Sequence, residues 1–274
     1  MKVTATVLAA ETLMPQMPIL AVKAAVFVQL WQHPLLEPAG ETDGAYYRHF
    51  AEMVAKGDLA LSSKDSYFGQ PPSAFFIAPL YIYFLGLVFK LTGGSIVAAR
   101  AVQLVLGAGA VFLLGAAVQR WYGRTAGWIA GALAAGCGLF SFFEALILPA
   151  ALDPFLTALD LWAIGRAADA DGAGSKRKWA VAGAALGLHA LNRPHLAFVL
   201  AGLALVVLGV KQGEALRARA IRAAMVLAAG LMVIAPVTIR NYAVGGEVIP
   251  IASTFGIRSE EHTSELQSRE TISY

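Results

Sequence analysis

The stretch that decides the fold is IVAARAVQLVLGAGAVFLLGAAV, residues 96–118. It is apolar almost throughout, and it is long enough to cross the hydrocarbon core of a membrane as a helix. Lipid offers the backbone no hydrogen-bond partners, so only helices and closed barrels can cross it. The run is continuous and rich in Ala, Leu, Gly and Val rather than alternating, which favours a helix.

Six further stretches share this character, and together they indicate an integral membrane protein of the all-α class. Of the 274 residues, 58% are hydrophobic and only 14% are charged, whereas soluble domains carry about 25% charged residues. The further predicted spans are 17–36, 125–142, 149–165, 179–191, 195–210 and 223–239. The sequence therefore predicts a polytopic transmembrane helical bundle. Its net charge of +3 is small and does not indicate nucleic-acid binding.

The charged loops predict the orientation of this bundle. Basic side chains cluster in 166–178, which ends in Lys-Arg-Lys, and in 211–222. The positive-inside rule places both loops in the cytoplasm. The first loop, about 37–95, holds six acidic and three basic residues between 37 and 72. We therefore place this loop on the outer face.

The apolar run 73–91 within the first loop has two interpretations. Pro79 divides it, and a helix from Pro79 to Leu91 would be about 20 Å long, short of the roughly 30 Å hydrocarbon core. Proline also suits the first turn of a helix. We expect an interfacial helix on the outer face, anchored by Tyr81, Tyr83 and Phe84. If the run were instead a span, both basic loops would lie outside.

Asp43 is the candidate catalytic residue of the first loop. It begins the sequence Asp-Gly-Ala-Tyr-Tyr, which ends at Tyr47, and it comes just before a helix-like stretch, 45–56, that Gly57 ends. One interpretation is an N-cap, because Asp is a favoured capping residue. The other is a general base that takes a proton from an acceptor hydroxyl. The local sequence leaves both open.

Four more charged residues are placed on the outer face by the same topology. Glu144 and Asp153 stand beside predicted spans, where acids are costly unless they are functional or paired. Arg193 and Arg240 stand at span ends and would suit the phosphate of an anionic lipid. Their alternative is ordinary snorkelling to the interface, and capping is the simpler interpretation of Asp153. The histidines lack metal-ligand spacing, so no metal cofactor is supported.

With these residues in place, the chain resembles the GT-C membrane glycosyltransferases. The resemblance is to the family 39-like group related to protein mannosyltransferases and aminoarabinose transferases. The motifs are DGAYY at 43–47, APLYIYFLG at 78–86, FFEAL at 142–146, LNRP at 191–194 and IRNYAVGGE at 239–247. They follow the order of the family.

The resemblance implies a fold, a reaction and a set of site residues. It implies an outer-face active site, a polyprenyl-phosphate sugar donor, a lipid, glycan or protein acceptor, and Asp43 as the catalytic base. Glu144 matches the second acidic position, and Tyr47, Arg193 and Arg240 are the other candidate substrate-binding residues. The family often has two adjacent acids in its first motif, whereas here Gly44 follows Asp43. The expected location is the inner membrane of a bacterium.

Two alternative functions remain open, and the last segment of the chain has an unusual sequence. The alternatives are a multi-span transporter or lipid flippase, which would predict symmetric halves, and a scaffolding subunit. The last segment, 258–274, contains RSEEHTSELQS, which reads as the translation of a common sequencing adapter. We expect it to be a non-native tail, and 1–257 to be a truncated transmembrane module.

Overall fold

The computed structural model describes residues 23–25, 28–29, 36–38, 42–62, 73–170, 173–209 and 215–253. Its main elements are α3 (Asp43–Ala55), α4 (Leu80–Thr92), α5 (Ile96–Tyr122), α6 (Arg124–Gly136), α7 (Gly138–Ala145), η3 (Pro149–Ala151), α8 (Asp153–Ala168), α9 (Ala173–Ala190), α10 (Leu196–Gly209) and α11 (Leu216–Gly245). No strand occurs in these ranges, which confirms the all-α fold class. Most of the predicted first span and all of the tail lie outside the described residues.

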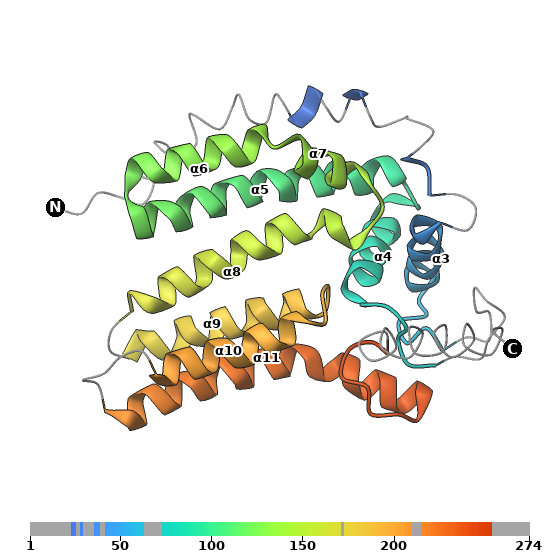
Figure 1. The fold of residues 1–274 in the computed structure, drawn as a ribbon. Helices are drawn as coiled ribbons and strands as arrows, with labels where there is room; N and C mark the ends of the chain where they lie inside the picture. Colours follow the sequence, from blue (N-terminus) through green and yellow to red (C-terminus); the bar gives the residue numbers. More distant parts are fainter. Residues whose placement is uncertain are drawn as a thin grey trace, which may run out of the picture.

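The long helices run side by side between the two ends of a single bundle (Figure 1). α5 and α6 form its upper layer in this view, α8 the middle, and α9, α10 and α11 the lower layer. α3 and α4 lie across the right-hand end, which we call the α3–α4 end (Figure 1). The chain reverses after each long helix, so the predicted basic loops lie at the opposite end.

Two of the described helices are long and apolar enough to cross a membrane, α5 with 27 residues and α11 with 30. A third crossing is formed if α6 and α7, which are bent by 51° around Cys137, count as one broken span. The span predicted for 125–142 therefore corresponds to two helices with a bend between them. α8, α9 and α10 run between the same two ends with 16, 18 and 14 residues, and they do not meet the same criterion of length and apolarity.

α9 and α11 are the most closely packed pair, and small residues explain why. A Cβ atom on Gly183 would lie 2.1 Å from the backbone oxygen of Val226, and one on Gly187 would lie 2.6 Å from that of Gly230. Two glycines four residues apart on one helix face let backbones approach closely, as in many membrane helix pairs. This contact fixes the lower layer and with it the turn that follows α9.

α4 matches the helix predicted for 79–91 to within one residue at each end, its place at the interface stays a prediction, and one of its predicted anchors does not fit. It has 13 residues, follows Pro79, ends at Gly93 and lies across the end of the bundle (Figure 1). Tyr81, predicted to be an anchor in the interface, is instead fully buried. It packs edge-on against Tyr47 of α3 and donates a hydrogen bond of 2.7 Å to Gln103 of α5. Aromatic residues serve interface anchoring and helix packing equally well, so the sequence did not separate the two.

α3 begins two residues earlier than predicted, and its cap is a different residue. Thr42 is the N-cap, and its hydroxyl accepts a hydrogen bond from the Ala45 backbone N–H. Asp43 is the first residue of the helix, so the capping interpretation of Asp43 was wrong. A β-branched residue with a hydroxyl caps nearly as well as Asp. This leaves the Asp43 carboxylate free for another role.

Candidate active site

The Asp43 carboxylate stands at the exposed start of α3. Among the residues that the structure describes, none makes a hydrogen bond or ion pair with it. The start of α3 packs close to the chain ahead of η3, because a Cβ atom on Gly44 would lie 3.1 Å from Cβ of Pro38 and 3.5 Å from the backbone oxygen of Ile147. Position 44 therefore has little room for the second carboxylate that the predicted motif often carries.

A second acid, Asp153, stands at the start of α8 and is fully engaged. Arg193 donates to it in the bidentate geometry that suits a guanidinium and a carboxylate, with Nη2 2.6 Å from Oδ2 and Nε 3.2 Å from Oδ1. Asn192 donates to Oδ1 at 2.7 Å and to the backbone oxygen of Pro149 at 3.0 Å. The turn between α9 and α10 is thereby fastened to the start of α8. Nη1 of Arg193 has no partner within the described ranges, so one edge of the guanidinium stays open.

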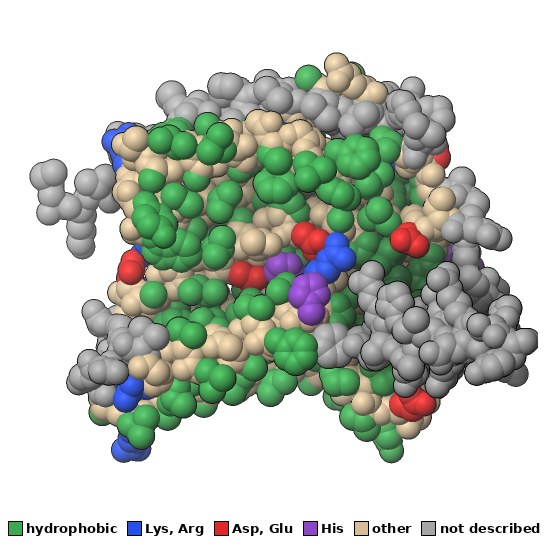
Figure 2. All heavy atoms as spheres, viewed as in Figure 1, with side chains coloured by type: hydrophobic (Ala, Val, Ile, Leu, Met, Phe, Trp, Pro, Cys, Tyr) green, Lys and Arg blue, Asp and Glu red, His purple; other side chains and the backbone are tan. Residues whose placement is uncertain are grey.

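Below this pair, two further polar residues continue the network into the bundle. His189 Nδ1 lies 2.6 Å from Asp160 Oδ2, and its Nε2 lies 3.9 Å from Asp153 Oδ1. Both His189 and Asp160 are buried. Figure 2 shows acidic, basic and histidine side chains gathered in the middle of a largely apolar face, beside α8 and α9. Ionisable residues within a membrane bundle are rare unless they are paired or functional.

Tyr47 connects the Asp43 side of the site to the Asp153–Arg193 pair. Its ring is buried against Tyr81. Burial raises the pKa of the Tyr47 phenol, the Arg193 charge opposes this rise, and the charges of Asp43 and Asp153 add to it. The three charges therefore lie close enough to Tyr47 to act on its phenol. Tyr47 is neutral at physiological pH and can donate a hydrogen bond.

In this structure Glu144 pairs with a lysine, and its predicted contact with the substrate stays a prediction. The Glu144 carboxylate is 2% exposed and pairs with the amino group of Lys23, whose Nζ lies 2.5 and 2.8 Å from its two oxygens. A Cβ atom on Gly107 would lie only 2.0 Å from Oε1, so α5 leaves space for this pair by having no side chain there. The pair also explains how a lysine is accommodated within a predicted span.

Arg240 is likewise occupied by the protein itself. Its guanidinium donates to the backbone oxygens of Ala60, Leu61 and Ser73 at 2.7, 3.0 and 2.7 Å. It also stacks on Phe75, with 4.1 Å between the guanidinium carbon and the ring centroid. Arg240 thus holds the two described parts of the first loop against α11. This arrangement brings Asp43, Tyr47 and Arg193 together, and commits Glu144 and Arg240 to other contacts.

The comparison with known families now bears on this site. Residues 76–239 match the family model described as dolichyl-phosphate-mannose-protein mannosyltransferase. The chain belongs to this family. The match confirms the predicted resemblance, and it makes the chain a membrane glycosyltransferase of a kind that uses polyprenyl-phosphate-linked sugars. No curated protein and no solved structure matches the chain.

The part matched to the mannosyltransferase family covers only some of the site. It runs from the segment before α4 through most of α11, so it contains Asp153 and Arg193 but neither Asp43 nor Tyr47. The role of Asp43 therefore stays a prediction. No group of three or more metal-ligating side chains lies together in the described chain.

Sequence reasoning missed several buried polar residues that shape the site. Arg100 of α5 is fully buried and donates to the backbone oxygens of Ala145 and Leu36 at 2.9 and 2.6 Å. Gln103, one turn later, donates to the backbone oxygens of Glu144 and Leu146 at 2.7 and 2.9 Å. A signal was present, because Arg and Gln inside the apolar run 96–118 require partners. The sequence could not name those partners, which lie more than 40 residues away.

Proposed function

We propose that this protein is an inverting glycosyltransferase that moves a sugar from a polyprenyl-phosphate donor to an acceptor hydroxyl. Its reaction takes place at the α3–α4 end, which faces the outer side of a bacterial inner membrane. The family match supports the donor class. The observation that carries the assignment of the site is the exposed Asp43 carboxylate, unpaired within the described residues, in one neighbourhood with Tyr47 and Arg193.

In this mechanism Asp43 is the general base. Its carboxylate takes the proton of the acceptor hydroxyl while the hydroxyl oxygen attacks the anomeric carbon of the donor. The new glycosidic bond forms as the bond between the anomeric carbon and the phosphate oxygen breaks. The polyprenyl phosphate leaves with the electron pair, and inversion follows from the single displacement. No nucleotide and no covalent enzyme intermediate is needed.

Arg193 and Tyr47 bind the donor in this proposal. The open Nη1 edge of Arg193 faces the phosphate, because a guanidinium held by Asp153 on its other edge keeps a fixed orientation. The neutral Tyr47 phenol donates to a sugar or phosphate oxygen. His189 acts as a positioning residue, since it lies between Asp160 and Asp153 and restrains the acid that holds Arg193.

The test is sugar transfer by the complete natural protein from labelled polyprenyl-phosphate donors. We expect Asp43→Asn to lower the rate about 100-fold or more, because loss of a general base costs 10²–10⁴-fold. Asn is nearly isosteric with Asp, and the cap of α3 is Thr42, so the melting temperature should be unchanged.

The matched control is Glu52→Gln, which removes an acid from the same helix. Glu52 pairs with Arg48 on the surface of α3, so its loss should leave transfer near the wild-type rate. Transfer at the wild-type rate by the Asp43→Asn variant would overturn the assignment of the base.

A further inference from the structure

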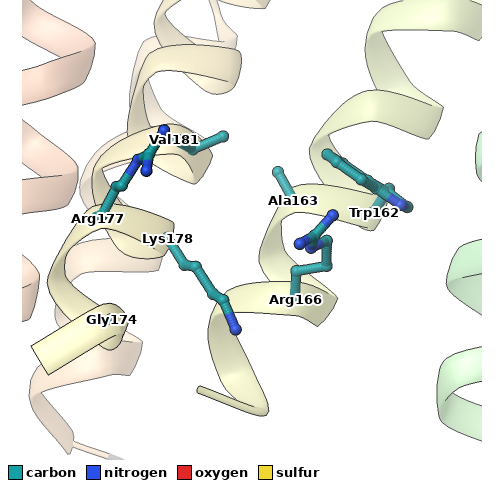
Figure 3. Close-up of a pocket in the computed structure, with 7 residues that line it drawn as sticks. All are labelled: Trp162, Ala163, Arg166, Gly174, Arg177, Lys178 and Val181. Carbon is teal, nitrogen blue, oxygen red and sulfur yellow. The ribbon is translucent and has the colours of Figure 1, made fainter. Parts of the chain in front are cut away.

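A basic pocket lies at the end of the bundle opposite to α3 and α4. It has a volume of about 420 Å³ and lies between the last turns of α8 and the first turns of α9. Figure 3 shows Lys178 reaching from α9 toward α8, with Arg166 and Trp162 on the α8 side. The lining residues are Trp162, Ala163, Arg166, Gly174, Arg177, Lys178 and Val181. Three of them are cations and none is an acid.

The three cations have no counter-charge in the described part of the chain. Neither Arg166 nor Arg177 nor Lys178 forms an ion pair there with a carboxylate. Arg120 at the same end of the bundle shows the contrast, since its Nη1 lies 2.5 Å from Asp169 Oδ2. Like charges held around one cavity repel one another, and a bound anion relieves that repulsion.

Other features of the pocket also favour an anion. The guanidinium carbon of Arg166 lies 4.8 Å from the ring centroid of Trp162, so stacking orients the cation. Gly174 has only backbone atoms, so the wall at that point is the first turn of α9. The unpaired N–H groups of a first turn carry the positive end of the helix dipole.

The position of the pocket identifies the kind of anion. It lies at the end of a membrane bundle, where headgroups meet the helices, and Trp162, Ala163 and Val181 give it apolar walls. A soluble phosphate would gain nothing from those walls, whereas a lipid places its headgroup among the cations and its glycerol and acyl chains along them. Basic pockets between transmembrane helices are suited to anionic lipids.

We propose that this pocket binds the phosphate headgroup of an anionic phospholipid. The site is separate from the sugar-transfer site, since it lies at the other end of α8, and it does not depend on the function proposed for Asp43. The lipid bridges α8 and α9, and so fixes the position of the two helices that carry Asp153, Asp160 and His189.

The experiment is native mass spectrometry of the complete protein, titrated with phosphatidylglycerol or with phosphatidylcholine. We expect one phosphatidylglycerol to be retained, at least tenfold more tightly than phosphatidylcholine. Lys178→Ala and Arg166→Ala should each weaken retention about fivefold, the effect of one cation near a lipid phosphate. The matched control is Lys176→Ala. Lys176 carries the same charge as Lys178 and stands two residues before it, but it does not line the pocket.

Four outcomes would overturn the proposal. The first is equal retention of the two lipids. The second is equal weakening by Lys176→Ala, which would indicate a diffuse surface charge. The third is displacement of phosphatidylglycerol by millimolar inorganic phosphate, which would make the pocket a site for a free anion. The double variant Arg177→Glu/Lys178→Glu gives a second reading, and retention by it at wild-type strength would also reject the site.

Discussion

At the scale of single residues, two acids at one end of the bundle have opposite surroundings. Asp153 accepts hydrogen bonds from Arg193 and Asn192, whereas Asp43 is exposed and has no such partner within the described residues. An acid that is already paired is a poor proton acceptor, because the ion pair stabilises its charged form. This difference, more than proximity to the membrane, selects Asp43 over Asp153 as the base.

The buried pair of Glu144 and Lys23 gives a prediction about stability. Removing one partner leaves an unpaired charge in the interior, which typically costs 3–5 kcal/mol. We therefore expect Glu144→Leu to lower the free energy of unfolding by about that amount. Thermal unfolding of the protein in detergent measures the loss.

The second half of this test is the double variant Glu144→Leu/Lys23→Met. Replacing both charges with apolar groups of similar size is often neutral or stabilising. The double variant should therefore be much more stable than Glu144→Leu alone. If the two variants unfold at the same temperature, the ion pair is not what holds α7 in place.

The sequence predicted at which end of the bundle the charged residues lie, but it did not predict which residues they contact. Alternation of the spans put Asp43, Glu144, Arg193 and Arg240 at one end of the bundle, as the structure does. Their partners were out of reach, since Lys23 and Glu144 are 121 residues apart and Arg240 and Ala60 are 180 apart. A charged residue in an apolar run indicates that it has a partner, but a single sequence does not identify that partner.

At the scale of elements, the contact between α9 and α11 depends on two glycines. Any side chain on Gly183 or Gly187 would meet the backbone of α11. We expect Gly187→Ala to cost about 1–3 kcal/mol, as overpacking usually does, although alanine favours a helix more than glycine. A lower melting temperature would show the effect.

Gly202→Ala is the matched control for that substitution. It changes the same residue type in the neighbouring helix α10, where an added Cβ would meet nothing within 4 Å. Helix propensity then acts alone, and the variant should be as stable as the wild type or slightly more stable. Equal effects at the two positions would mean that backbone entropy, not helix contact, governs both.

Local signals predicted the elements better than their fine structure. Pro79 and Gly57 marked helix ends that the structure confirms within a residue or so. The bend around Cys137 was not predicted although Gly136 and Gly138 flank it, because a glycine inside an apolar run is also tolerated in a continuous helix. Tyr81 and the Thr42 cap were misplaced because one residue type fits two local roles.

At the scale of the whole molecule, the orientation of α4 can be tested by labelling. Single cysteines would replace the half-buried Glu52 on α3 and the exposed Lys90 on α4 and Arg217 on α11, in a background where Cys137 is changed to Ser. We expect a membrane-impermeant thiol reagent added to intact cells to label the first two and not the third.

The pattern of labelling separates the alternatives. Labelling of Glu52→Cys but not of Lys90→Cys would mean that α4 crosses the membrane, and the interfacial assignment would fail. Labelling of Arg217→Cys alone would place the α3–α4 end in the cytoplasm, which would contradict an outer-face reaction. Opening the cells should expose all three positions and so confirms that each thiol is reactive.

The contacts of Arg240 also set an order of events during synthesis. The loop segment that it holds, around Ala60, leaves the ribosome 180 residues before Arg240 does. At about 5–20 residues per second, that interval is roughly 10–40 s. The first loop, which carries Asp43, therefore cannot form its contact with Arg240 until α11 has been synthesised. A chain whose synthesis stops before Arg240 would lack the contact that fixes its first loop.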